Sequence, residues 1–260
     1  MIPKIIHYCW FGCNPLPQLA LDCISSWKKF FPDYEIKEWN EDNFDVNIIP
    51  YTAEAYKQKK YAFVSDYARF WIIYNYGGIY FDTDVEVIRP MYDIIEKGNF
   101  MGFEVDPDGE NAPGKYAPRY CFNVNLGLGF GMNDHHCFMK KMMDYYSNMH
   151  FNGAVMDPWF KTIVAYITEA LMENGLRNVK GIQYVDDINV YPHDFFAPIN
   201  VISGRLHITE NTRTIHRYMG SWNVKSVSFV DKTKLYIKKM LPEWCYILIN
   251  KIKRRRYRIR

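Results

Sequence analysis

The sequence contains no long apolar run. A membrane-spanning helix needs roughly 20 consecutive, mostly apolar residues, and no stretch of the 260-residue chain approaches this. Residues 1–7, Met-Ile-Pro-Lys-Ile-Ile-His, also lack the basic segment, apolar core and small-residue cleavage site of a secretory signal peptide. We therefore expect a cytoplasmic protein without a membrane-spanning helix.

Paired cysteines are also missing. The six cysteines show no C-x-x-C spacing, which argues against the common zinc and redox motifs. Most of them stand among apolar neighbours in the sequence. They are therefore expected to be reduced, buried thiols, as in a protein of a reducing compartment.

Net charge is small, at +3, but it is unevenly spread. Residues 231–260 hold eleven Lys/Arg against two Asp/Glu, a net of +9, which leaves −6 for the preceding residues. A mildly acidic body argues against nucleic-acid binding. The basic segment follows the apolar, aromatic stretch 244–249, which favours an amphipathic tail on an anionic membrane. A disordered solubilising end is the alternative.

The pattern of apolar residues predicts an α/β fold. Residues 4–11 read as a buried strand, 18–31 as a helix stopped by Pro32, and 34–39 as a second strand. Strand, helix, strand is the usual opening of a domain with a parallel sheet. We expect one domain over 1–230 and a separate tail over 231–260. The later elements are expected as a buried helix at 62–76, a strand at 79–88, short strands among loops over 104–131, and helices at 134–149 (with Asp134 near its N-cap) and 159–174.

Two carboxylates, Asp82 and Asp84, follow the glycine pair at 77–78 and a short apolar run. Side chains of a strand alternate between its faces, so both are predicted to project to the same side. Two acidic groups there repel each other unless a cation lies between them. Mg²⁺ or Mn²⁺ prefers such oxygen ligands and can also bind phosphate oxygens. The stretch predicts metal-assisted chemistry on a phosphorylated or nucleotide-linked substrate.

A second Asp-x-Asp, at 106–108, serves as an internal comparison. Its Pro107 and Gly109 indicate a turn in which an aspartate caps the backbone. By contrast, Asp82 ends a buried run, and ligands bind beyond the carboxyl ends of strands in α/β sheets.

Asp66 and Arg69, three residues apart on the apolar helix 62–76, share one face. They are either an internal ion pair or a ligand-binding pair, and a buried ion pair adds little stability. Their place next to the carboxylates favours ligand binding.

Aromatic residues make up 17% of the chain, and some of them are candidates for stacking on a sugar or a base. Trp10, at the end of the first strand, is either such a shelf or part of the core, and His7 is expected in the core. His216 stands six residues before Trp222. Its imidazole is a candidate metal ligand, as is the hydroxyl of Ser221.

Several segments closely resemble glycosyltransferase family 32, which contains sugar transferases of bacterial capsules and surface polysaccharides. The resemblance covers roughly 1–225, and it is most specific over 1–90. It is carried by Ile-Pro-Lys-Ile-Ile-His-Tyr-Cys-Trp-Phe-Gly at 2–12, Ser-Trp-Lys-Lys-Phe-Phe-Pro-Asp-Tyr-Glu-Ile at 26–36, Phe-Val-Ser-Asp-Tyr-Ala-Arg at 63–69, Tyr-Gly-Gly-Ile-Tyr-Phe-Asp-Thr-Asp at 76–84 and Ile-His-Arg-Tyr-Met-Gly-Ser-Trp at 215–222. It implies a GT-A type, Rossmann-like fold with a mixed, mostly parallel sheet flanked by helices.

The resemblance also implies roles for individual residues. Asp84 would bind Mn²⁺ or Mg²⁺, with Asp82 beside it on the ribose and sugar, and Asp66 and Arg69 would hold the donor sugar. Which of His216 and Ser221 completes the metal shell stays open. The other residues implied at the nucleotide sugar are Trp10 near the base, Ser65, Tyr80 at the nucleoside, and Ser221 and Trp222 over the diphosphate.

The implied reaction moves a sugar from a UDP- or GDP-linked donor to a glycan or lipid-linked glycan, with retention, in surface polysaccharide synthesis at the inner face of the membrane. Double displacement would need a carboxylate on the other sugar face, and Glu104, Asp157 and Asp186 are candidates without motif support. Same-face attack is therefore the working hypothesis. The alternatives are a metal-dependent nucleotidyltransferase or phosphohydrolase, and a non-catalytic sugar-binding protein.

Overall fold

The computed structural model describes residues 1–107, 122–153, 161–200 and 204–219. The predicted tail and its boundary near residue 230 lie outside these residues, so the division into domain and tail stays a prediction. None of the helices in the described ranges is long and apolar enough to cross a membrane.

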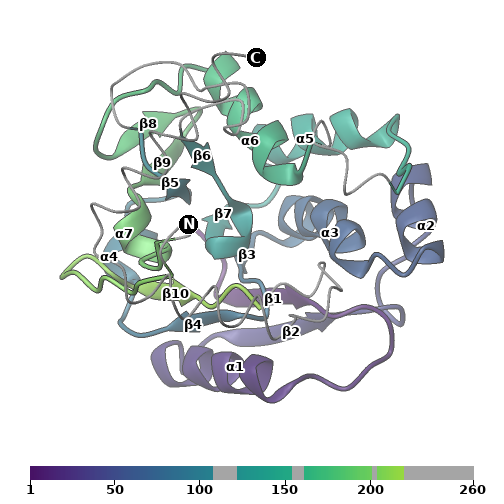
Figure 1. Ribbon diagram of the computed structural model, residues 1–260, viewed down its shortest axis with the longest axis horizontal. Coiled ribbons are helices and arrows are strands. Elements are labelled where there is room, and N and C mark those ends of the chain that lie inside the picture. Colours follow the sequence, from purple (N-terminus) through teal and green to yellow (C-terminus); the bar gives the residue numbers. More distant parts are fainter. Residues whose placement is uncertain (108–121, 154–160, 201–203, 220–260) are drawn as a thin grey trace, which may run out of the picture.

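An eight-stranded sheet forms the centre of the fold (Figure 1). Its strands follow the order β2-β1-β3-β7-β5-β9-β8, with β6 paired to β5. A separate two-stranded sheet joins β10 to β4. The strands are β1 (Ile5–Cys9), β2 (Glu35–Trp39), β3 (Gly78–Tyr80), β4 (Val85–Val87), β5 (Phe100–Val105), β6 (Asn123–Val124), β7 (Phe130–Met132), β8 (Gln183–Val185), β9 (Ile188–Tyr191) and β10 (Thr214–His216).

The α/β class, with a mixed sheet flanked by helices, is confirmed. The expected predominance of parallel pairs is wrong for the strands described here. β1 pairs in parallel with β2 and β3, and β5 with β9, but the other four pairings of this sheet are antiparallel. The short strand β7 runs antiparallel to both β3 and β5, and it separates the parallel strands β2, β1 and β3 from the parallel pair of β5 and β9.

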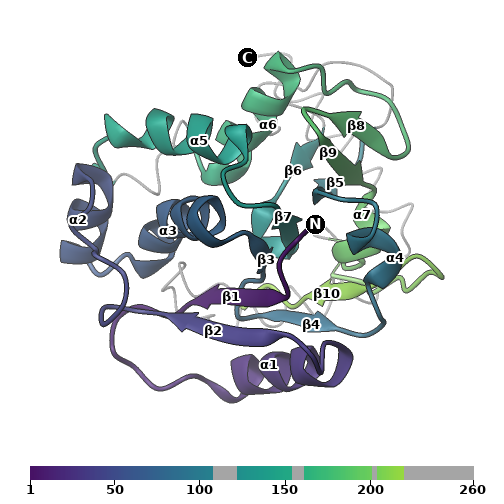
Figure 2. The ribbon, with the colours of Figure 1, turned by 180° about the vertical axis from the view of Figure 1, so that it is seen from behind.

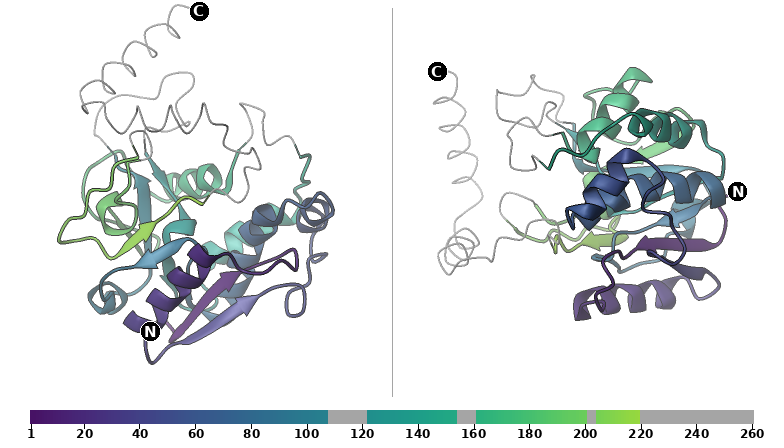
Figure 3. Two further views of the ribbon diagram at one scale, coloured as in Figure 1. Left: turned by 60° about the horizontal axis from the view of Figure 1, so that its bottom comes forward. Right: turned by 90° about the vertical axis from the view of Figure 1, so that its right-hand side faces the viewer.

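Helices cover both faces of the sheet (Figures 1 and 2). α2 (Pro50–Lys57), α3 (Tyr61–Tyr76), α5 (Cys137–Ser147) and α6 (Ile163–Glu173) enclose one apolar core. α1 (Gln18–Phe30), α4 (Tyr92–Ile95) and α7 (His193–Phe196) enclose a second core on the other face, together with β4. Figure 3 shows the same layers from two further directions.

Two of the expected helices follow directly from their sequences. α1 buries Ala20, Cys23, Ile24 and Trp27, which recur at helical spacing, and it ends just before Pro32. α3 is apolar on nearly all sides and is buried between α2, α5 and the sheet. It ends at Gly77, whose φ of 60° lies in the left-handed region that favours glycine.

The predicted strand 79–88 is wrong as a single element. The structure forms β3 and β4 instead, in two different sheets, with a turn between them in which the Val85 N–H donates to the Asp82 carbonyl (3.0 Å). The chain leaves the central sheet after Tyr80 and passes through the site at 82–84. It then forms β4, which pairs with β10 in the separate two-stranded sheet. The aspartates therefore lie in a turn, not on a strand.

Some smaller predictions also need correction. The helix expected to be capped by Asp134 begins after His136, whose Nδ1 accepts the N–H of Phe138 (3.2 Å). Among the cysteines described, Cys9 and Cys23 are buried as expected, but Cys13 and Cys137 are exposed. All four are free thiols. α2, with a proline in its first turn, is a helix that the sequence pattern did not predict.

Candidate metal and donor-sugar site

The parallel strands bring several candidate residues to one edge of the central sheet. β1 and β3 run in parallel, and so do β5 and β9. Because β7 is antiparallel to both β3 and β5, all four strands end at the same edge. Trp10 follows β1, Asp82 follows β3, Glu104 lies near the end of β5 and His193 follows β9. Ligands of α/β sheets bind beyond such carboxyl ends.

Asp82, Asp84 and His216 meet at this edge. One ligand atom from each lies within 4.8 Å of the others. His216 arrives on β10, opposite Val85 of β4, and its Nε2 lies 3.1 Å from Oδ1 of Asp84. The other oxygen of Asp84 accepts the backbone N–H of Met219 (2.7 Å). The small sheet therefore carries Asp84 and His216 to Asp82.

Helix α1 holds this small sheet in place. The indole N–H of Trp27 donates to the Val85 carbonyl (2.7 Å), and the Ser26 hydroxyl accepts the N–H of Val87 (2.9 Å). Both bonds join side chains of α1 to the backbone of β4, and the face of α1 that points away from the core is exposed. These two bonds hold the backbone of β4, which follows Asp84 directly, and so help to fix the position of Asp84.

The protonation of the cluster favours a pair of opposite charges in the metal-free protein. Burial opposes charge on Asp84, but hydrogen bonds from His216 and the Met219 backbone outweigh it and hold its pKa below the usual range. Burial likewise lowers the pKa of His216, but Asp84, Asp82 and Glu104 outweigh it and raise that pKa. The imidazolium thus stands where a cation is needed between carboxylates.

A divalent cation fits this donor set. Two carboxylate oxygens suit Mg²⁺ or Mn²⁺, and the imidazole shifts the balance towards Mn²⁺. Nε2 of His216 faces Asp84 and is therefore the nitrogen placed to bind a metal. Among the residues described, the buried Nδ1 of the same ring has no hydrogen-bond partner. A bound cation would replace the proton of His216 and relieve the repulsion between Asp82 and Asp84.

Asp66 and Arg69 of α3 are connected to the cluster through Asp82. Nη2 of Arg69 lies 3.2 Å from Oδ1 of Asp66 and 3.3 Å from Oδ1 of Asp82. Burial raises the pKa of Asp66 to about 7, although Arg69 opposes the shift. Burial also raises the pKa of Asp82, again against Arg69. One buried guanidinium therefore compensates two carboxylates, of which Asp82 is the more exposed, at 29% of its side chain.

The remaining predicted donor residues surround Arg69 or lie at the end of β1. Tyr80 is 1% exposed, with its ring 4.9 Å from the Arg69 guanidinium. Ser65 contributes its carbonyl, which accepts the Nε–H of Arg69 (3.1 Å). Trp10 is half-buried, and its Nε1–H donates to the Asn14 carbonyl (2.6 Å). Trp10 thus has an accessible surface, whereas Tyr80 lies beneath Arg69.

The sequence interpretation missed Asn125, Gly127 and Tyr218. The Cα of Gly127 lies against Asp82, where a Cβ would stand 2.2 Å from Oδ2. Asn125 accepts the Gly127 N–H (2.8 Å) and donates to Oε1 of Glu104 (3.0 Å). The Tyr218 ring lies 4.2 Å from that of His216, centre to centre. Asn125 and Gly127 stand two residues apart in an apolar stretch, which is a turn signal. This signal could have indicated a second segment of the chain next to Asp82.

Other candidates lie elsewhere. Asp106 of the second Asp-x-Asp accepts the backbone N–H of His193 (2.7 Å), a long-range contact and not a local turn cap. The rest of the turn predicted there, with Asp108 and Gly109, lies outside the described residues. Asp186 lies in the turn between β8 and β9, which is at the opposite edge of the sheet from Asp82, and it is therefore excluded as a nucleophile. Ser221, Trp222 and Asp157 lie outside the described residues.

A carboxylate pair with an imidazole, joined to an Asp–Arg pair beyond the carboxyl ends of the strands of an α/β sheet, is an arrangement that suits a divalent cation and a phosphorylated ligand. Residues 17–101 match the family model described as "Glycosyltransferase sugar-binding region containing DXD motif". This stretch includes Asp66, Arg69, Asp82 and Asp84. This part of the chain is therefore similar to the sugar-binding region of DXD-motif glycosyltransferases.

Curated proteins with similar sequences are glycosyltransferases. Inositol phosphoceramide mannosyltransferase 3 of Schizosaccharomyces pombe is 29% identical over 142 residues, which cover 48% of this chain and 40% of that protein. A human alpha-1,4-N-acetylglucosaminyltransferase is 37% identical over 91 residues, 35% of this chain and 21% of that protein. The chain thus spans less than half the length of these relatives.

Among solved structures, the glycosyltransferase PaToxG is similar at 18% identity and a TM-score of 0.47, over 66% of this chain and 69% of that one. The galactosyltransferase LgtC is similar at 14% identity and a TM-score of 0.35, over 92% of this chain and 98% of that one.

Proposed function

We propose that the protein transfers a sugar from a nucleoside-diphosphate sugar to a hydroxyl group of a glycan, and that it needs a divalent cation to do so. The observation that supports this most directly is the cluster of Asp82, Asp84 and His216, which Arg69 connects to Asp66. The cluster fits a cation that binds diphosphate oxygens, and the connected pair offers both a carboxylate and a guanidinium to sugar hydroxyls.

The residues of the chain would divide the work as follows. Asp84 and His216 hold the cation, with Asp82 between the cation and the sugar. Arg69 keeps Asp82 ionised and oriented, because its guanidinium is the charge that offsets burial at this carboxylate. Asp66, also held by Arg69, accepts hydrogen bonds from hydroxyls of the donor sugar. When bound, Mn²⁺ or Mg²⁺ supplies Lewis-acid stabilisation of the charge that develops on the leaving diphosphate.

Transfer with retention is the proposed stereochemical course. A covalent route needs a carboxylate on the sugar face opposite the leaving group. Of the three earlier candidates, Glu104 alone lies at the site edge among the residues described. Its carboxylate accepts from Asn125 and faces Tyr218, whose pKa is raised by burial and by Glu104. These contacts connect Glu104 to the residues around His216 and do not include Arg69. Same-face attack on the donor stays the proposed course.

The biological setting is proposed from the resemblance to family 32. The donor is UDP- or GDP-linked, and the acceptor is a glycan or lipid-linked glycan of a surface polysaccharide. The basic segment 231–260 would hold the enzyme at the inner face of the cytoplasmic membrane. This location would bring the site to an acceptor that grows on a lipid carrier.

A panel of nucleotide sugars, incubated with the full-length protein and Mn²⁺, tests the proposal. We expect hydrolysis or transfer with at least one donor, and loss of turnover with chelator and in the double variant Asp82→Ala/Asp84→Ala. Turnover that survives in this variant would overturn the proposed role of the cluster.

Two further outcomes identify the alternatives. Hydrolysis of nucleotides or phosphoesters without any dependence on the sugar would indicate a nucleotidyltransferase or phosphohydrolase. Glycan binding that survives in Asp84→Asn, with no nucleotide bound, would indicate a sugar-binding protein without catalysis.

A further inference from the structure

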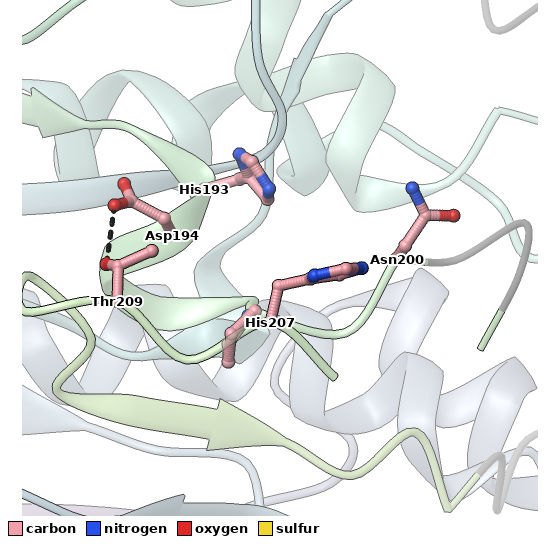
Figure 4. A pocket seen from close by; sticks show the side chains of 6 residues that line it. His193, Asp194, Asn200, His207 and Thr209 are labelled. Atoms are coloured by element: carbon pink, nitrogen blue, oxygen red, sulfur yellow. Dashed lines mark hydrogen bonds between the residues drawn. The ribbon is translucent and has the colours of Figure 1, made fainter. Parts of the chain in front are cut away.

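A polar pocket lies near the site edge, outside the cluster described above (Figure 4). It has a volume of about 400 Å³, within the range of roughly 300–1,000 Å³ typical of small-molecule sites. Figure 4 shows the rings of His193 and His207 on its wall, with the Asp194–Thr209 pair to one side and Asn200 to the other. Its lining is His193, Asp194, Pro198, Asn200, His207 and Thr209.

The strand directions place this pocket beside the site. β9 runs parallel to β5, with Tyr191 opposite Gly102, so His193 emerges at the edge where β5 ends. Asp106 joins the two, since its Oδ2 lies 2.7 Å from Nδ1 of His193. Glu104, two residues before Asp106, accepts from Asn125 (3.0 Å), and Asn125 in turn holds the N–H of Gly127, which lies against Asp82. The end of β5 therefore connects the pocket with the cluster.

The polar groups of the pocket are held in fixed orientations. Asp106 binds both the ring and the backbone N–H of His193. Asp194 accepts from the Thr209 hydroxyl (2.8 Å) and from the Asn211 amide (3.1 Å). Fixed donors and acceptors around a cavity give specificity for a ligand with many hydroxyl groups, because each hydroxyl can both donate and accept.

The charge of the lining favours a neutral ligand. The lining contains one carboxylate, Asp194, and two imidazoles, of which His193 is already paired with Asp106. Among the described residues that line the pocket there is no Lys or Arg, so these residues offer a diphosphate no strong partner. The apolar ring of Pro198 adds a surface suited to the carbon face of a sugar.

We propose that this pocket is a carbohydrate subsite that binds one sugar residue of the acceptor glycan, next to the donor site. Its role as an acceptor subsite rests on the proposed function, whereas its binding of carbohydrate does not. The donor would occupy the β1–β3 half of the edge and the acceptor the β5–β9 half. The end of β5, with Glu104, would lie between them.

Histidine signals provide a direct binding test. The chain has seven histidines, so a protein labelled at histidine gives a spectrum that single substitutions can assign. Methyl glycosides of glucose, galactose, mannose and N-acetylglucosamine are the probes. We expect at least one of them to shift the signals of His193 and His207 and to leave those of His7 and His150 unchanged. His150, on the far side of the molecule at α2, is the matched surface control.

Two pocket variants measure the contribution of each imidazole. His193→Ala and His207→Ala should each weaken glycoside binding about fivefold, the effect of one lost hydrogen bond, and His150→Ala should not. His207 is exposed, so its removal leaves the fold intact even where His193→Ala does not. With a p-nitrophenyl glycoside as acceptor, His207→Ala should raise the acceptor KM about fivefold without changing the donor KM.

The outcomes separate this inference from the proposed function. If the protein turns over a nucleotide sugar but no methyl glycoside at tens of millimolar moves either pocket histidine, the subsite is overturned and the function stands. If glycosides bind at His193 and His207 but no nucleotide sugar is bound or turned over, the carbohydrate site stands and the enzymatic function falls. An equal rise of acceptor and donor KM in His207→Ala would also overturn the subsite.

Discussion

Gly127 is the residue whose substitution is predicted to act most selectively on the metal site. A Cβ there would stand 2.2 Å from Oδ2 of Asp82, so Gly127→Ala forces this carboxylate out of the position in which it lies near Asp84 and His216. We expect Mn²⁺ affinity to fall at least tenfold, as for residues that orient metal ligands. Titration calorimetry of the purified protein with Mn²⁺ measures this.

Gly131→Ala is the matched control for this prediction. Its Cβ would stand 2.4 Å from Cε1 of Phe100 in the core, a clash of similar closeness that does not involve Asp82. Overpacking costs about 1–3 kcal/mol, so this variant should melt earlier and keep its Mn²⁺ affinity. If both variants lose affinity equally, Gly127 has no specific role at Asp82.

His7 predicts a specific loss of stability in acid. Its Nδ1 accepts the indole N–H of Trp39 (3.0 Å), so the ring carries its proton on Nε2, 3.0 Å from the Gly77 carbonyl. Protonation would set a second N–H against that of Trp39. Burial, helped by Lys37, lowers the pKa of His7 to about 4.

The sign of the effect follows from the proton count. Between pH 6.5 and 4, His7 is protonated in the unfolded chain but neutral in the folded protein, so the free energy of unfolding falls as the pH falls. From pH 7 to 5 the loss is about 2 kcal/mol. Urea unfolding at both pH values should show this loss in the wild type and a smaller one in His7→Gln. A loss of equal size in the variant would contradict the assignment to His7.

At this scale the sequence predicted residues that the structure brings together, in one case for a wrong reason. Asp82 and Asp84 were expected together because strand side chains alternate, but the strand ends at Tyr80 and a turn brings them together. The sequence indicated His216 less clearly, because His216 is brought close to Asp84 only by the pairing of β10 with β4. Such a long-range pairing of two three-residue strands leaves no local pattern.

The small sheet of β4 and β10 is expected to respond to metal. Two-stranded sheets are marginally stable alone, and this one carries Asp84 and His216 while Asp82 belongs to the segment that leaves the central sheet. A bound cation would connect the two. We expect the backbone amides of 214–219, including the Arg217 N–H that donates to the Asp84 carbonyl (2.9 Å), to exchange about tenfold more slowly with Mn²⁺.

Hydrogen exchange followed by mass spectrometry measures this protection. The hairpin of β8 and β9, which takes no part in the cluster, is the internal control and should not change. The variant Asp84→Asn should lose the protection at 214–219. Protection that persists in this variant would show that the metal acts elsewhere.

The elements differ in how far the sequence could predict them. β1, α1, β2 and α3 carry continuous apolar patterns with clear stops, and their ends lie within two residues of prediction. The largest difference is at the end of β1, which is two residues shorter than expected. α2 has a weak apolar pattern over eight residues and was missed. The split of 79–88 into β3 and β4 could not be predicted, because the apolar residues on both sides of Asp82–Asp84 are equally suited to one strand.

The whole molecule is predicted to bind anionic membranes through residues 231–260. Deletion of this segment should move the protein from the membrane fraction to the soluble fraction. A variant with glutamine at the Lys and Arg positions of 251–260 keeps the chain length and removes the charge. It should lose binding to vesicles of phosphatidylglycerol and phosphatidylcholine, since each basic residue contributes about 1 kcal/mol near such a surface. Unchanged fractionation of the deletion variant would refute the membrane role.

The reversal of direction at β7 has a consequence for how this protein could diverge. The match to the sugar-binding family model covers residues 17–101 and ends inside β5, so it includes β2, β3, Arg69 and the aspartates. The residues that line the pocket at His193 all follow β9 and lie outside the matched part. Selection could therefore remodel recognition of one substrate while the inherited machinery for the other stayed constant, and relatives with the same donor could serve different glycans.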